Sequence, residues 1–92
     1  MRTTVVGLVT PHLMRVVDLA NQAEQGINVD WHVRDAVART MDELRHQYNA
    51  STLAESYIEG LEAVAGEAPR TREAYVGILR AAAAAARKLR PD

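Results

Sequence analysis

Residues 69–90 read PRTREAYVGILRAAAAAARKLR, and this stretch decides the fold. Its apolar positions recur at alternating intervals of four and three residues, the spacing with which one helix buries a seam against another. These positions are Tyr75, Leu79, Ala82, Ala86 and Leu89. The alanine run from Ala81 to Ala86 strongly favours a helix, and its small side chains let neighbouring backbones approach closely. The sequence therefore predicts a helix from Pro69 to Arg90 around which the rest of the chain packs.

Three further amphipathic stretches precede this one. We expect helices from about Pro11 to Gln25, from a cap at Asn28 or Asp30 to about Tyr48, and from Thr52 to Gly66. Glycine residues follow or end the first and third stretches, as is typical of helix C-termini. The third begins with the spacing of a capping box, Thr52-Leu53-Ala54-Glu55. The most regular apolar stripe, in the second, is Val33, Val37, Met41, Leu44 and Tyr48.

The links between these helices are short, which places neighbouring helices antiparallel. We therefore expect an all-α fold, a small four-helix up-down bundle with a short extended N-terminal segment. All 92 residues form a single helical domain in this interpretation. A chain of this size buries only roughly 60–65% of its unfolded surface, and such small domains often gain stability by associating.

The N-terminal segment allows two interpretations. Residues 3–9 are rich in β-branched side chains, which favours an extended strand or strap followed by a helix with Thr10 as its cap and Pro11 in its first turn. In the alternative, the segment joins the first helix, and Pro11 then interrupts that helix. Helical spacing also relates the apolar positions Val5, Val9, Leu13, Val16 and Ala20.

Charge is divided unevenly along the second half of the chain. The third expected helix and its exit carry four glutamates and no basic residue, whereas the chain after them carries six basic residues against two acidic ones. In an antiparallel helix pair these flanks meet, so we expect Glu55 to lie near Arg80. The same register places Glu62 near Arg72. The basic residues that this pairing leaves unmatched are Arg87, Lys88 and Arg90.

Catalytic and metal-binding motifs are not apparent. The chain has no cysteine, which excludes thiolate chemistry and disulfides. Glu43 and His46 have the spacing of a carboxylate-bridged metal site, but the apolar stripe of their helix lies elsewhere, so both should face solvent. Ser51 and Ser56 do not lie in a strand-to-helix elbow of the kind that exposes a nucleophile. We therefore expect no enzyme activity, no cofactor and no metal.

One stretch resembles a DNA-binding motif. Residues 65–72, read as AGEAPRTR, are similar to the turn and the recognition-helix start of helix-turn-helix proteins. The resemblance, extended over residues 61–80, implies nucleic-acid contacts from Arg70, Arg72 and Arg80. The net charge of −1 does not favour a nucleic-acid partner. A DNA-binding transcriptional regulator is therefore the alternative function.

Association with protein is the function that we expect. A run of small residues with basic ends, on a chain too small for a large core, predicts a homodimer or a docked partner helix. Trp31 either plugs one end of the bundle or anchors a partner, as exposed tryptophans often do. The expected partner-binding residues are Trp31, Ala81, Ala84, Ala85, Arg87, Lys88 and Arg90.

The sequence also suggests a setting for this interaction module. Ten of the eleven basic residues are arginine, and alanine is abundant, which indicates a GC-rich genome such as that of an actinobacterium or its phage. No apolar run approaches the ~20 residues that span a bilayer, and the first residues do not form a secretion signal. We therefore expect a small cytoplasmic regulator or adaptor without a membrane partner.

Overall fold

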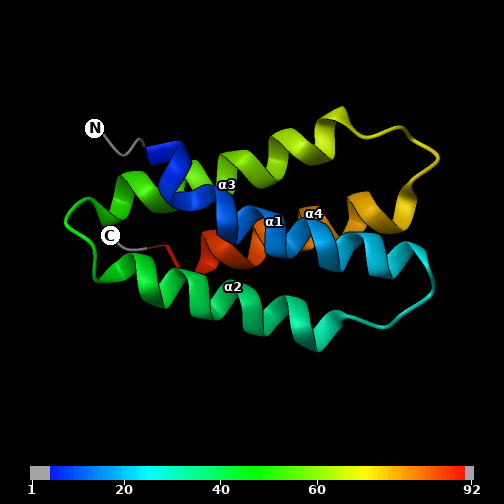
Figure 1. Ribbon diagram of the computed structural model, residues 1–92, viewed down its shortest axis with the longest axis horizontal. Helices are drawn as coiled ribbons and strands as arrows, with labels where there is room; N and C mark the ends of the chain where they lie inside the picture. Colours follow the sequence, from blue (N-terminus) through cyan, green and yellow to red (C-terminus); the bar gives the residue numbers. More distant parts are fainter. Residues whose placement is uncertain (1–4, 91–92) are drawn as a thin grey trace.

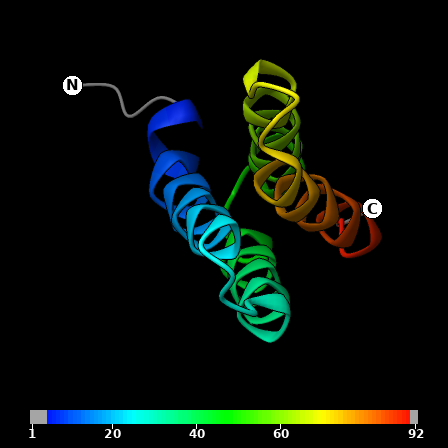
Figure 2. The same cartoon turned by 90° about the vertical axis from the view of Figure 1, so that its right-hand side faces the viewer.

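In the computed structural model, which describes residues 5–90, the chain forms four helices and no strand. They are α1 (Val5–Glu24), α2 (Asp30–Arg45), α3 (Ala50–Glu67) and α4 (Glu73–Lys88). Successive helices run in opposite directions along the long axis (Figure 1). Figure 2 shows the α1–α2 hairpin on one side and the α3–α4 hairpin on the other. The predicted all-α up-down bundle is confirmed.

The core follows the predicted stripe of α4. Tyr75, Leu79, Ala82 and Ala86 are buried, and α4 contacts all three other helices, most extensively α1 and α3. Leu89 lies just beyond the end of α4 and remains 40% exposed. The largest fully buried side chains from the other helices are Tyr57, Met41, Leu53, Ile58 and Leu61. The alanines of α4 leave the space that these large side chains fill, which explains the close packing of a core with little aromatic content.

The N-terminal segment is helical where the structure describes it. The extended conformation predicted for residues 3–9 is wrong for Val5–Val9, which form the first turns of α1, whereas Thr3 and Thr4 lie outside the described residues. Val9 is buried in the core. Its burial extends the apolar face of α1 beyond Pro11. The helix continues through Pro11 although proline has no N–H to donate a helical hydrogen bond. Figure 1 shows the first turns of α1, in dark blue, at an angle to the rest, as a proline inside a helix often produces.

The link between α2 and α3 differs from its prediction. α2 ends at Arg45, so Tyr48 lies in the connecting turn with its side chain fully exposed rather than on the apolar stripe. α3 begins at Ala50, and its N-cap residue, Asn49, makes no side-chain capping hydrogen bond. Thr52 therefore lies within the first turn of α3, and the predicted capping box is wrong. The backbone already turns helical at Asn49, whose carbonyl accepts a hydrogen bond from the Leu53 N–H at 3.0 Å.

The helix ends that glycine was expected to mark are found near the predicted places. Gly26 follows α1 with a φ of 88°, the left-handed conformation that glycine adopts without strain. α2 is preceded by Asn28, whose side-chain oxygen accepts a hydrogen bond from the Asp30 N–H at 3.1 Å. α4, by contrast, begins only at Glu73, because residues 69–72 form a turn in which the Arg72 N–H bonds the Pro69 carbonyl. This later start contributes to a register between α3 and α4 that differs from the predicted one.

Candidate protein-binding groove

α3 lies along one flank of α4 and forms two ion pairs with it. Nη2 of Arg87 lies 2.7 Å from Oε1 of Glu62, and Nη1 of Arg90 lies 3.0 Å from Oε2 of Glu55. Both pairs are about half exposed and therefore contribute little stability individually, but they fix the register of the two helices. The C-terminal end of α4 is thus held against the N-terminal part of α3.

The ion pairs predicted for this seam are wrong. Glu55 meets Arg90 rather than Arg80, and Glu62 meets Arg87 rather than Arg72. The turn before α4, which was predicted as helix, accounts for part of this change of register. The C-terminal part of α4 therefore lies alongside α3. Ala82, Ala83 and Ala86 are all buried. Arg87 and Arg90, which were expected to be unmatched, are the residues that α3 engages.

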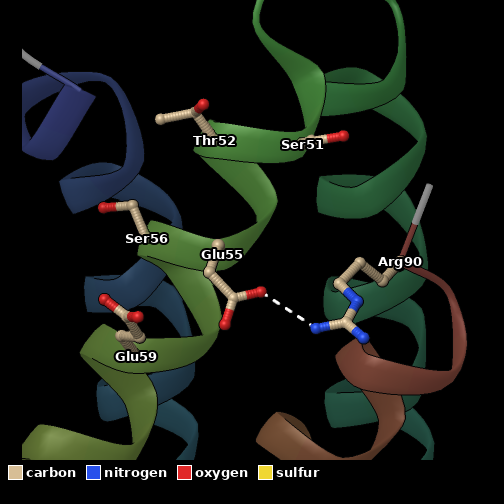
Figure 3. Close-up of a pocket in the computed structure, with 6 residues that line it drawn as sticks. All are labelled: Ser51, Thr52, Glu55, Ser56, Glu59 and Arg90. Carbon is tan, nitrogen blue, oxygen red and sulfur yellow. Dashed lines mark hydrogen bonds and ion pairs between the residues drawn. The ribbon is translucent and has the colours of Figure 1, made fainter. Parts of the chain in front are cut away.

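A shallow hollow of about 550 Å³ lies beside the Glu55–Arg90 pair. Figure 3 shows that the hydroxyl groups around it point in different directions, and that only the Glu55 carboxylate is directed at Arg90. The remaining lining residues are Ser51, Thr52, Ser56 and Glu59. No histidine adjoins these hydroxyls, and nucleophilic catalysis by serine needs a base within hydrogen-bonding distance. We assign this hollow no chemistry.

The other flank of α4 is open towards α2. A groove of about 700 Å³ runs between the two helices. Its apolar lining consists of Val33, Val37, Ile78, Ala81, Ala84, Ala85 and Leu89. Charged residues at its edges are Asp30, Arg34 and Lys88. These three are exposed, and none of them makes an ion pair with another described residue. Apolar grooves on proteins can bind the apolar face of an amphipathic helix.

The structure divides the predicted partner-binding residues into two groups. Ala81, Ala84, Ala85 and Lys88 line the groove together. Arg87 and Arg90 lie on the opposite flank and are paired with α3.

Trp31 follows Asp30 in the first turn of α2 without lining the groove, and it is 69% exposed. It makes an edge-to-face contact with His32, with ring centroids 5.5 Å apart. The interpretation of Trp31 as an end plug is therefore wrong.

Sequence reasoning missed the α2 wall of the groove. Val33 and Val37 were recognised as apolar stripe residues, and they are buried, but nothing marked them as the floor of an open surface. Arg34 and Ile78 carried no signal of their own. The groove exists because α2 and α4, which are not consecutive, lie side by side. A local pattern does not encode that contact.

The three arginines of the alternative DNA-binding site lie in different environments. The Nε of Arg72 donates to Oε1 of Glu24 at 2.8 Å, and its Nη2 donates to Oδ1 of Asn21 at 2.7 Å. Its guanidinium also lies over the ring of Tyr75, 3.8 Å from the centroid. The hydrogen bond from Arg72 lowers the pKa of the Glu24 carboxyl. Arg72 thus connects the end of α1 to the start of α4.

Arg70 and Arg80 are exposed and line one hollow of about 440 Å³ near the α3–α4 turn. This hollow also contains Glu73. The structure therefore brings together two of the three predicted nucleic-acid residues and separates the third from them.

A polar chain leads from the surface into the bundle. Oε2 of Glu43 lies 3.6 Å from Nε2 of His12, and Nδ1 of His12 lies 3.4 Å from the buried Thr40 hydroxyl. His12 is largely covered, while Glu43 and His46 are exposed as expected. Within the described part of the chain, no three histidine or acidic side chains gather closely enough to hold a metal ion.

The buried Tyr57 side chain is the most unusual polar group in the core. Its ring is fully enclosed, and its hydroxyl, although the Thr40 side chain lies nearby, makes no hydrogen bond of normal geometry with the described residues. Burial raises the pKa of this hydroxyl to about 12. Tyr57 therefore remains neutral at physiological pH and contributes to packing rather than to proton transfer.

Comparisons with known proteins add no assignment: no family model, curated protein or solved structure matches the chain. Within residues 5–90, no helix combines the length and the apolar character needed to cross a membrane.

Proposed function

We propose that the protein is a non-enzymatic protein–protein interaction module that associates with itself through the α2–α4 groove. In this role it acts as a small bacterial or phage regulator or adaptor in the cytoplasm. The observation that carries the proposal is the groove itself, an apolar surface between two helices whose bordering charges are unpaired. A bound helix would cover the exposed side chains Ala81, Ala84 and Leu89 and bring partners to the charges. Amphipathic helices bind to other proteins in apolar grooves in this way.

Two further observations support this surface over the other hollows. Ala81 and Ala84 are exposed on α4, and their small side chains permit another helix to approach closely. The hollow near Glu55 is lined by polar side chains, and its ion pair is already made within the chain. The α2–α4 groove therefore offers the larger gain on covering apolar surface.

The test is the oligomeric mass of Ala84→Glu. Light scattering at tens of micromolar should give a mass above that of the monomer for the wild type and a lower mass for Ala84→Glu, because an unpaired charge would be buried in the interface. Ala63→Glu is the control, since Ala63 is an exposed residue of α3 outside the groove, and its mass should equal that of the wild type. A monomeric wild type, or an unchanged mass for Ala84→Glu, would contradict the proposal.

DNA binding remains the alternative, on the observation that Arg70 and Arg80 are exposed around one hollow. A gel-shift assay at two salt concentrations tests it, because phosphate contacts make the affinity fall steeply as salt rises. Salt-sensitive binding that the double substitution Arg70→Gln with Arg80→Gln abolishes would favour a DNA-binding regulator. Absence of a shift at low salt would remove this alternative.

A further inference from the structure

We infer that the occupant of the α2–α4 groove is α4 of a second copy of the chain, lying antiparallel to α2, with Asp30 of each copy beside Lys88 of the other. The inference rests on the proposed function and makes it specific, since it names the partner helix, its direction and the charges that meet. It follows from where the two charged residues lie at the edges of the groove.

Asp30 and Lys88 lie at diagonally opposite corners of the groove. α2 and α4 run in the same direction along the bundle (Figure 1). Asp30 is the first residue of α2 and Lys88 is the last of α4, and both line the groove. They therefore occupy opposite ends and opposite walls of the same surface, and they carry opposite charges.

A two-fold axis makes this arrangement self-complementary. In a symmetric dimer the same patch faces itself, so that each contact between two residues occurs twice. A rotation of 180° about an axis that lies in the interface, perpendicular to the line from Asp30 to Lys88, turns one groove over to face the other. The corner with Asp30 then faces the corner with Lys88 of the other copy, and two ion pairs close the interface.

The opposite direction of docking is disfavoured by charge. If α4 of the second copy lay parallel to α2, its first residue, Glu73, would approach Asp30, and two carboxylates would meet. In the antiparallel direction the basic C-terminal end of one helix lies beside the acidic N-terminal end of the other, which also suits the helix dipoles. The antiparallel direction is therefore the one that the charges select.

The shape of α4 suits this role. Its exposed alanines, Ala81 and Ala84, make it narrow enough to lie in a shallow groove between two helices. Arg34 lies one turn beyond Asp30 on α2. In the antiparallel register it faces the alanines that precede Lys88 in the other copy, so its aliphatic stem can cover them.

A charge-exchange series tests the inference. The dissociation constant of the dimer is measured by sedimentation equilibrium at low salt for the wild type, Asp30→Lys, Lys88→Asp and the double variant. Each single substitution places like charges together twice and should weaken the dimer by about tenfold or more. The double variant restores opposite charges at both corners and should recover most of the wild-type affinity.

The double variant also separates association from folding. Asp30 and Lys88 each favour the end of the helix on which they lie, so reversing both charges is unfavourable for the isolated monomer. Recovery of the dimer in the double variant can therefore arise only from contacts between copies. Thermal unfolding followed by circular dichroism shows whether each variant is folded at the temperature of the measurement.

The possible failures are distinguishable. If Ala84→Glu dissociates the dimer while both single charge variants associate like the wild type, the groove is the interface but this register is overturned. If the double variant is as weak as the single variants, the pairing of Asp30 with Lys88 is also overturned. A wild type that remains monomeric overturns both this inference and the proposed function.

Discussion

The two flanks of α4 belong to the same alanine-rich helix, yet one flank is ion-paired with its neighbour and the other is not. On the α3 side, Glu62 and Glu55 lie within ion-pairing distance of Arg87 and Arg90. On the α2 side, the groove has two cations and one anion at its edges, and none of them pairs with another described residue. The small alanine side chains of α4 thus allow both neighbouring helices to approach, and the side chains of each neighbour determine whether ion pairs form.

The largest difference between the flanks should appear when apolar side chains are truncated. Leu79 is fully buried, so Leu79→Ala should lower the free energy of unfolding by ~2–5 kcal/mol. Ile78, the preceding residue, is only partly covered at the groove, and Ile78→Ala should cost the monomer clearly less. Urea denaturation of both variants at a concentration where the protein is monomeric measures the difference. Equal losses would mean that the groove wall is packed as tightly as the core.

Alkaline pH should lower the stability of the folded chain through Tyr57, a buried residue of α3. The pKa of its hydroxyl is about 12 in the folded chain, against 10.0 for an exposed tyrosine. Folding therefore favours the protonated form of the hydroxyl. Its contribution to the free energy of unfolding is fully present below pH 10 and is lost as the pH rises through 12, by roughly 3 kcal/mol in total.

Tyr57→Phe removes this part of the pH dependence and provides the control. At neutral pH it should be as stable as the wild type or more so, because the hydroxyl has given up water without gaining a partner. Urea midpoints of both proteins, recorded at several pH values between 7 and 12, test both statements. A loss of more than ~1 kcal/mol at pH 7 would show that the hydroxyl is hydrogen-bonded in solution.

Two glycines, Gly77 of α4 and Gly60 of α3, differ in the space available for an added side chain. Replacing glycine by alanine inside a helix gains ~1 kcal/mol of helix propensity. At Gly77 of α4 an added Cβ meets nothing within 4 Å, so Gly77→Ala should gain this amount. At Gly60 of α3 the Cβ would lie 2.7 Å from Cδ1 of Leu13, so that side chain must move. Thermal unfolding should therefore rank Gly77→Ala above Gly60→Ala, and the reverse order would show that α1 and α3 pack more loosely than described.

The smallest expected effect concerns the ion pairs of the seam. Arg87→Gln breaks a half-exposed pair with Glu62 and should cost at most ~1 kcal/mol, less at high salt. Lys88→Gln, its neighbour at the groove, breaks no ion pair with a described residue and should leave monomer stability nearly unchanged. Chemical denaturation at low and high salt distinguishes them. If the two substitutions cost the same, the pairs contribute register but no stability.

The apolar stripes were readable from the sequence because burial imposes a period on each helix. Val33, Val37, Met41 and Leu44 are buried as that period indicates, and so are four of the five stripe positions of α4. The boundaries were less readable. Periodicity alone could not decide between a strand and a helix at Val5–Val9, and a turn ending in Arg72 resembles a helix start.

The ion pairs and the groove needed information that no local pattern holds. The partner of Glu62 is Arg87, fifteen residues beyond the predicted Arg72, and the start of α4 four residues later than predicted accounts for only part of that shift. The groove depends on how far α2 lies from α4, which is set by the whole bundle. Composition was enough to predict Ala84 and Lys88 as partner-binding residues. It could not predict the α2 residues that line the groove with them.

The contact of Arg72 with Glu24 and Asn21 has a kinetic consequence. Arg72 is 48 residues from Glu24 and 51 residues from Asn21 along the sequence. The contact can therefore form only after α1 and α4 have met. Contacts absent from the folding transition state slow unfolding and leave the folding rate unchanged. Stopped-flow measurements on Arg72→Gln should therefore show faster unfolding and unaltered refolding. Arg72 would then prolong the lifetime of the folded chain without changing the speed with which it folds.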